Sequence, residues 1–284
     1  MRFNNTTAEI FVPDGIPEEE ALSRTTRMAV AAHQDDIEIM AFDGILKAFR
    51  NPREWFCGVV VTNGSGSPRA GVYAGYTDEE MMAVRRREQR KAAVIGEYGA
   101  QVLLDYPSSA VKDPSNSAPV DDLTTLLFAA RPRVVYTHNL ADKHDTHVAV
   151  ALRLIEAVRR LPEDARPEKL YGCEVWRDLD WLVDSDKVAF DVSAHENLQS
   201  ALLGVFDSQV SGGKRYDLAT LGRRRANATY HESHGVDAAT GMIFAMDLTP
   251  LVEDVSLDVG EFVLGYIRRF SEDVSGRVSR FSKR

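Results

Sequence analysis

Compact apolar runs alternate with stretches of helical periodicity through about the first 190 residues of the chain. The apolar runs end in polar residues and have the length of buried strands; they span residues 27–33, 54–64, 100–107, 132–139, 169–177 and 187–193. The amphipathic stretches predict helices at residues 37–51, 77–96, 121–130 and 148–161. This alternation indicates βαβ units, and therefore an α/β fold with a mostly parallel sheet flanked by helices.

The two ends of the chain depart from this alternation. Residues 1–25 contain two prolines and an acidic run, and they predict an irregular N-terminal arm. About residues 195–284 predict two further helices, one strand and an amphipathic C-terminal helix that begins at Val259. Because no repeat or linker interrupts the chain, we expect a single domain over residues 1–284, with these C-terminal elements added to the same sheet. The last helix is expected to pack on the domain or on another subunit, which leaves a homo-oligomer open.

The composition excludes several classes of partner. Hydrophobic residues make up 44% and charged residues 27% of the 284 positions, as in globular proteins. The formal net charge of −9 argues against nucleic acid, and the arginine runs 85–87 and 223–225 are interpreted as solvated helix faces. No run approaches the roughly 20 apolar residues that cross a bilayer, and no signal-peptide core is present. We therefore expect no membrane partner and a cytoplasmic location, with both cysteines packed in the core.

Two polar clusters follow predicted strands, at the place where open α/β sheets bind ligands. The first is the run 33–36, His-Gln-Asp-Asp, and the second extends from His138 to His147. Carboxyl ends of separate βα units can meet in one crevice, so the clusters can converge across more than 100 residues of sequence. Imidazoles and carboxylates together suit Zn²⁺ or another first-row divalent ion.

The adjacent aspartates Asp35 and Asp36 need an explanation, because two neighbouring carboxylates repel each other. If one of them binds the metal, the other can face a metal-bound water and stay ionised as a general base. The structural alternative is a helix N-cap followed by an acidic first turn. The residues alone leave open which groups are ligands and which is the base.

The two clusters also carry a family resemblance. The segment AAHQDDIEIMAFDGI at 31–45 resembles the Ala-His-Pro-Asp-Asp-Glu signature of the LmbE/PIG-L family of zinc-dependent N-acetylglucosaminyl deacetylases. The segment DKHDTHVAV at 142–150 resembles the second signature of that family. Weaker similarity is found at 62–67, 85–93 and 202–209, so the resemblance covers about residues 27–210. It implies an LmbE-like, Rossmann-like sheet with additional C-terminal strands and a helix.

The resemblance also implies roles for individual residues. The zinc ligands would come from both signatures: His33, Asp36 and His147. Asp35 would be the general base, and His144 would assist the tetrahedral intermediate. Arg85 and Asn63 would contact the substrate, a small-molecule amino sugar or its conjugate. The implied activity is zinc-dependent N-deacetylation, in which water on the metal attacks the amide carbonyl.

The first signature departs from the family pattern at two positions. Gln34 replaces the usual proline, which predicts a less rigid loop. Ile37 takes the place of the usual glutamate, and Glu38 follows one position later. Glu38 either substitutes for that glutamate or only serves the helix dipole as an early helix residue.

The second signature departs more strongly. Asp145 stands where proline is usual, and Thr146 where aspartate is usual. If that aspartate orients His144, then Asp145 or Asp142 has to supply the carboxylate. The change keeps two alternatives open: hydrolysis of another amide on the same scaffold, and a non-catalytic protein that binds the metal or a sugar.

Other candidate residues lie outside the signatures. His231 and His234 either edge the pocket or have a surface or capping role. Trp55, Tyr73 and Tyr76 could stack on a sugar, but anchoring of the core or of a loop is the simpler interpretation.

Overall fold

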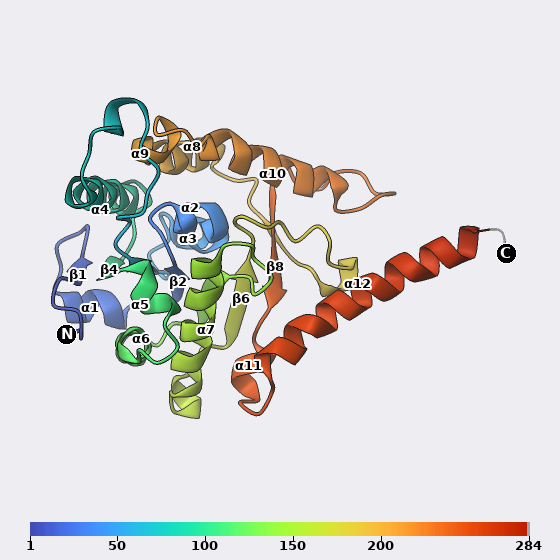
Figure 1. Ribbon diagram of the computed structural model, residues 1–284, viewed down its shortest axis with the longest axis horizontal. Helices are drawn as coiled ribbons and strands as arrows, with labels where there is room; N and C mark the ends of the chain where they lie inside the picture. Colours follow the sequence, from blue (N-terminus) through green and yellow to red (C-terminus); the bar gives the residue numbers. More distant parts are fainter. Residues whose placement is uncertain (283–284) are drawn as a thin grey trace.

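The computed structural model describes residues 1–282 and confirms the α/β fold (Figure 1). Its sheet has eight strands in the order β1-β4-β3-β2-β5-β6-β8-β7. The strands are β1 Glu9–Phe11, β2 Arg27–Ala31, β3 Phe56–Thr62, β4 Ala100–Tyr106, β5 Val134–His138, β6 Lys169–Cys173, β7 Val188–Asp191 and β8 Met242–Asp247. Strands β4, β3, β2, β5 and β6 pair in parallel, whereas β1 pairs antiparallel to β4 and β8 pairs antiparallel to both β6 and β7.

Helices cover both faces of the sheet, so the central strands are buried on both sides. One layer contains α1 Glu18–Ser23, α5 Ser108–Lys112, α6 Ala118–Ala130, α7 Asp145–Arg159 and α11 Pro250–Glu253. The other contains α2 Asp36–Met40, α3 Phe42–Ala48, α4 Asp78–Ile95, α8 Glu196–Gly204, α9 Asp207–Val210 and α10 Tyr216–Tyr230. Strand β2 shows the alternation directly, because Met28 and Val30 enter one core while Ala29 and Ala31 enter the other.

Helix ends follow local chemistry. Thr77 and Glu80 form a reciprocal capping box that starts α4 at the predicted position. The helix predicted at 37–51 is instead divided into α2 and α3, because Ala41 leaves helical geometry with φ −113° and ψ 24°. Helix α2 is therefore a short element that starts almost directly after β2 and stays close to the sheet edge where the first polar cluster lies.

The N-terminal arm is more ordered than its sequence predicts. The arm contributes β1 to the sheet edge and α1 to one helix layer. Outside the arm, short 3₁₀ turns lie at Gly71–Tyr73, Glu163–Ala165 and Asp184–Asp186. Glu9 of β1 accepts hydrogen bonds from Arg90 at 2.7 Å and 2.5 Å, which ties the arm to α4. These contacts join residues 9 and 90, so the local sequence pattern of the arm could not predict them.

The C-terminal elements join the sheet as expected, since β7 and β8 extend it beyond β6. The last helix, α12 Val259–Phe281, packs its first turns on the core through Tyr266 and then extends away from the body (Figure 1). Its outer part leaves Val274, Val278 and Phe281 exposed. A second subunit at this helix stays a prediction. Among the described residues, none of the helices combines the length and apolar character that a membrane crossing requires.

Candidate metal centre and reaction pocket

The two polar clusters meet at the point where the strand order changes direction. From β2 the chain builds β3 and β4 on one side and then crosses to β5 and β6 on the other. A crevice therefore opens outside the carboxyl ends of β2 and β5, the usual ligand site of such sheets. His33 to Asp36 follow β2, and the second cluster begins with His138, the last residue of β5, and continues to His147.

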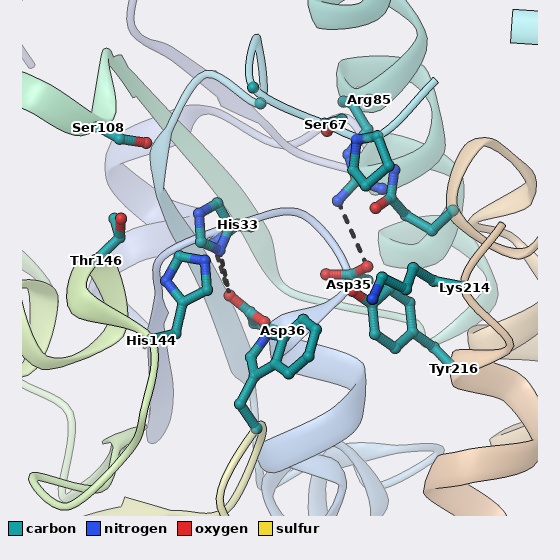
Figure 2. Close-up of a pocket in the computed structure, with 15 residues that line it drawn as sticks. His33, Asp35, Asp36, Ser67, Arg85, Ser108, His144, Thr146, Lys214 and Tyr216 are labelled. Carbon is teal, nitrogen blue, oxygen red and sulfur yellow. Dashed lines mark hydrogen bonds and ion pairs between the residues drawn. The ribbon is translucent and has the colours of Figure 1, made fainter. Parts of the chain in front are cut away.

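Three side chains converge closely in this crevice. His33 Nδ1 lies 3.1 Å from Asp36 Oδ2 and 3.2 Å from His147 Nε2, and the last two atoms are 3.3 Å apart (Figure 2 shows His33 and Asp36). Ligand atoms about 2.1 Å from a tetrahedral ion are separated by about 3.4 Å, so this triangle has the size of three metal ligands. Two imidazole nitrogens and one carboxylate oxygen fit Zn²⁺ or another first-row divalent ion.

Asp36 and His147 carry opposite charges when no metal is bound. Burial opposes ionisation of Asp36, but the rings of His147, His33 and His138 hold its pKa well below the ordinary value. Burial likewise opposes the charged form of His147, yet Asp36 and Asp142 raise its pKa to about 9. A metal ion bound here would displace the proton of His147.

His138 and His144 complete two overlapping triplets of potential ligands around His147, His33/His144/His147 and Asp36/His138/His147. Nε2 of His138 accepts the backbone N–H of Ala32 at 2.8 Å, so the lone pair that faces the cluster is already engaged. Burial also keeps the pKa of His138 well below its ordinary value, and the ring is neutral. His138 is therefore a structural neighbour of the cluster rather than a ligand.

His144 lies at the edge of the cluster, with its ring centroid 4.5 Å from that of His147 and 5.0 Å from that of His33. Burial and the neighbouring His147 lower the pKa of His144, so its ring is neutral at pH 7 in the metal-free protein. Neither Asp142 nor Asp145 forms a hydrogen bond with this ring within the described residues. The carboxylate that the family pattern supplies at position 146 has no replacement on His144.

Asp142 instead supports His147. Its Oδ2 lies 3.4 Å from His147 Nδ1 and accepts the backbone N–H of Trp176 at 3.1 Å. Its Oδ1 accepts the backbone N–H of His144 at 3.0 Å. Burial opposes ionisation, but His147 holds the pKa of Asp142 below the ordinary value. Carboxylates in this position fix the tautomer and orientation of a metal-binding histidine.

Asp35 has surroundings different from those of Asp36. Burial and the charge of Asp36 raise the pKa of Asp35 to about 7, although the guanidinium of Arg85 offsets part of the effect. Its side chain caps no helix, so the N-cap alternative is wrong for this residue. Its φ of +93° lies in the left-handed region that non-glycine residues avoid. Strain of this kind costs about 1–3 kcal/mol and is typical of functional positions.

Arg85 reaches the pocket from α4. Its side chain is buried, with Nη2 3.5 Å from Asp35 Oδ2 and Nη1 3.6 Å from Glu88 Oε2 (Figure 2). It also donates to the backbone carbonyl of Gln34, and Gln34 Nε2 donates to the carbonyl of Thr62 at 3.1 Å. Hydrogen bonds therefore hold the loop that lacks the usual proline, and its lower rigidity stays a prediction.

The interpretation of the arginine runs as solvated faces is wrong for two of their members. Arg85 is 1% exposed and Arg224 is 3% exposed. Arg224 donates to Gln199 Oε1 at 2.8 Å and to the carbonyl of Glu38 at 2.7 Å. It therefore anchors α10 to α2, while Arg85 anchors α4 to the first signature.

Glu38 lies in the core and does not face the pocket. Its Oε1 accepts from the hydroxyl of Tyr98 at 2.7 Å and from Gln89 Nε2 at 2.9 Å. Burial raises the pKa of Glu38 to about 8. Gln89 in turn accepts the backbone N–H of Asp35 at 3.3 Å. Glu38 therefore supports, through Gln89, the loop that carries Asp35. This role differs from both expected roles, which were to replace the glutamate of the signature or to interact with the helix dipole.

The converged residues line a cavity of about 270 Å³. His33, Asp35, Asp36, Arg85 and His144 all face it, whereas His147 is fully buried behind them. Ser67 and Gln209 also line the cavity and lie in the segments of weaker similarity at 62–67 and 202–209. Four further lining residues had no sequence prediction: Ser108, Trp176, Lys214 and Tyr216. Trp176 had a usable signal, because it follows the carboxyl end of β6, the strand next to β5.

Asn63 is not among the residues that line this cavity. Its side-chain carbonyl accepts the backbone N–H of Ser65 at 3.1 Å and closes the loop on itself. The neighbouring Gly64 lines the cavity instead, with φ +76° and no room for a Cβ beside Gln34 and Arg85. A substrate contact by Asn63 stays a prediction.

The remaining aromatic and histidine candidates also lie outside the cavity lining. The ring of Trp55 stacks under the guanidinium of Arg24, and the hydroxyl of Tyr73 donates to Asp207 at 2.6 Å. His231 and His234 line a separate open hollow beyond the end of α10. Loop anchoring therefore describes Tyr73, and the two histidines do not edge the reaction pocket.

Fold and site together define an α/β protein with a histidine–aspartate cluster at the switch point of its sheet. Residues 28–158 match the PIG-L family model, described as GlcNAc-PI de-N-acetylase. The matched region contains both signatures and α4 between them, so this part of the chain is similar to the PIG-L (LmbE-like) family. A search of curated proteins found no match.

Solved structures share the fold at low sequence identity. N,N′-diacetylchitobiose deacetylase from Pyrococcus horikoshii is 18% identical with a TM-score of 0.59, covering 78% of this chain and 83% of that one. The 4-carboxy-2-hydroxymuconate hydratase GalB from Pseudomonas putida is 16% identical with a TM-score of 0.57, covering 79% and 96%. The zinc-inhibited form of teicoplanin deacetylase Orf2 is 14% identical with a TM-score of 0.54, covering 79% and 98%. At these identities the likeness shows the fold, and function has to be argued from the site.

Proposed function

We propose that this protein is a metal-dependent N-deacetylase that hydrolyses the acetamide of an N-acetylglucosamine-type amino sugar or its conjugate. One observation carries the proposal: the adjacent aspartates Asp35 and Asp36 have different neighbours at the switch point of the sheet. Asp36 faces two histidine nitrogens within 3.3 Å, whereas Asp35 faces the cavity beside Arg85. The family description as a de-N-acetylase supports the reaction type.

His33, Asp36 and His147 would hold the metal, as their mutual distances and donor atoms fit a divalent ion. The ion would act as a Lewis acid that lowers the pKa of a bound water and polarises the amide carbonyl. We take zinc as the first candidate. Teicoplanin deacetylase Orf2, which shares the fold, is described in a zinc-inhibited form. Reconstitution of this protein should therefore also include cobalt, manganese and ferrous iron.

Asp35 would move the proton. Its carboxylate accepts a proton from the attacking water as the new C–O bond forms at the carbonyl carbon. The same proton then reaches the nitrogen as the C–N bond breaks, so the products are acetate and a free amine. The ion pair with Arg85 favours the ionised form that this role requires. His144, at the cavity wall, would donate a hydrogen bond to the carbonyl oxygen as negative charge develops there.

The cavity lining supports a polyhydroxylated substrate. Ser67, Ser108 and Gln209 offer side-chain hydroxyl and amide groups at the cavity wall. Trp176 adds an aromatic surface suited to the apolar face of a sugar ring. A different amide on the same scaffold is the second candidate. It is favoured by the missing carboxylate on His144.

Amine release from N-acetylated amino sugars and their glycosides tests the proposal. We expect turnover by metal-reconstituted protein and a loss of about 10²–10⁴-fold in Asp35→Asn, because a general base contributes that much. Metal content measured by elemental analysis should stay unchanged in this variant. Asp145→Asn, an exposed aspartate on α7, is the matched control and should keep full turnover. Undiminished turnover in a metal-loaded Asp35→Asn variant would refute the mechanism.

A further inference from the structure

A second cavity adjoins the reaction pocket. It has a volume of about 210 Å³ and is lined by Ile39, Val175, Trp176, Tyr216, Ala219, Thr220 and Arg223. Most of these side chains are apolar, in contrast to the serines, aspartates and histidines around the first cavity. None of the functional roles described above uses this space.

Two aromatic side chains line both cavities. Trp176 and Tyr216 line each of them, and their ring centroids lie 6.1 Å apart at an interplanar angle of 86°. The backbone of Trp176 is fixed to the metal cluster through Asp142, which accepts its N–H at 3.1 Å. The aromatic pair shared by the two cavities is therefore tied through Trp176 to the groups that surround the reaction.

Helix α2 sets the spacing between the two cavities. Asp36 on its first turn faces the reaction pocket, and Ile39 three residues later lines the apolar cavity. Side chains three residues apart on a helix lie about 5–6 Å from each other. One small molecule can therefore place an amide in the first cavity and an apolar group in the second.

We infer that the apolar cavity is a substrate subsite that binds a single ring or a short hydrocarbon chain on the amine side of the amide, as the aglycone of the amino sugar. An apolar cavity of about 150 Å³ in another protein holds benzene, so this one has room for a ring with a short substituent. The inference rests on the proposed function, because the sugar is assigned to the polar cavity and only the group beyond it meets apolar walls.

Direct binding tests the subsite without turnover. The probes are phenyl and methyl glucoside, which lack the acetamide, titrated calorimetrically into the protein as purified. Burying a phenyl ring should make the phenyl glucoside bind at least about tenfold more tightly than the methyl glucoside. Ala219→Trp, which fills the cavity from α10, should remove this preference. Ala226→Trp on an exposed position of the same helix is the matched control and should keep it.

Turnover separates the subsite from the proposed reaction. With phenyl and methyl glycosides of N-acetylglucosamine, the ratio of kcat/KM should favour phenyl in the wild type and in Ala226→Trp, and should fall in Ala219→Trp. Preferential phenyl glucoside binding without any amine release would support the subsite while overturning the deacetylase. Amine release without a phenyl preference in binding or turnover would overturn the subsite alone. An advantage for N-phenylacetyl over N-acetyl substrates that Ala219→Trp removes would place the acyl group there and contradict the assignment.

Discussion

Asp36 and Glu174 are both 3% exposed, yet their carboxylates have opposite surroundings. Glu174 accepts the backbone N–H groups of Leu179 and Phe244, each at 3.1 Å, and the side-chain amide of Asn227. Every one of these partners is an obligate donor, so the carboxylate is satisfied by the protein itself. Asp36 Oδ2 accepts the backbone N–H of His33 at 2.7 Å, but its other close neighbours are imidazole nitrogens, which can lose their protons.

The difference shows in the pKa values of the two acids. Burial raises the pKa of Glu174, because its hydrogen bonds only partly offset the loss of solvent. Burial acts on Asp36 as well, but the rings of His147, His33 and His138 hold its pKa well below the ordinary value. Burial therefore does not mark the site. The nature of the facing groups does, since a carboxylate among imidazoles can exchange their protons for a metal ion.

The largest effect is expected from exchanging each carboxylate for its amide. Asp36→Asn removes the anionic ligand between His33 and His147, so metal affinity should fall by more than about 100-fold. Glu174→Gln should leave metal affinity unchanged, because its partners Leu179, Asn227 and Phe244 are not among the residues of the metal cluster. Calorimetric titration of both metal-free variants measures the contrast. Equal affinities would remove the distinction between the two acids.

A smaller effect on metal affinity is expected from the carboxylate behind His147. Asp142→Asn should weaken metal binding about 10–100-fold, because the orienting acceptor on Nδ1 is lost. Asp145→Asn removes a neighbouring charge that is exposed and serves as the control. If both variants weaken binding equally, Asp142 acts only through general charge and does not orient the ring.

The structural carboxylate should affect stability instead. Glu174→Leu leaves the N–H groups of Leu179 and Phe244 and the amide of Asn227 without their acceptor. We expect a loss of about 3 kcal/mol in the free energy of unfolding, since an orphaned buried donor costs about 1–3 kcal/mol. Urea denaturation of the metal-free protein measures it. A loss below about 0.5 kcal/mol would mean that water replaces the missing carboxylate.

The smallest expected effect is a dependence of stability on pH. The pKa of Glu174 is raised in the folded protein, so its contribution to stability is complete below the ordinary value of 4.5. That contribution is lost as pH rises through the folded-state pKa, with a slope of at most about 1.4 kcal/mol per pH unit. Glu174→Gln should flatten the slope above pH 4.5 in denaturation curves of the metal-free protein. An unchanged slope would assign it to other groups.

Sequence reasoning predicted what local patterns and chain order determine. The parallel strands, the helix that begins near Thr77 and the convergence of the clusters after β2 and β5 all follow from short segments read in order. The break at Ala41 was missed, because α2 and α3 share one apolar periodicity. Strand β1 was missed as well, since three residues at a sheet edge leave too weak a pattern.

The rest of the site depends on long-range packing. Lys214 and Tyr216 reach the cavity from a loop and helix more than 60 residues beyond the second signature, where no motif marks them. The sequence also could not predict which imidazole ring Asp142 contacts, because spacing alone does not distinguish His144 from His147. Side-chain direction across the βα loop settles that choice in favour of His147.

Anomalous diffraction from crystals soaked in zinc or cobalt tests the metal site most directly. We expect one strong peak at the switch point, within bonding distance of His33 Nδ1, Asp36 Oδ2 and His147 Nε2, with Asp35 outside the ligand set. The peak should be absent from Asp36→Asn crystals soaked in the same way. A peak bound by His138, or no peak in wild-type crystals at saturating metal, would contradict the assignment of these three ligands.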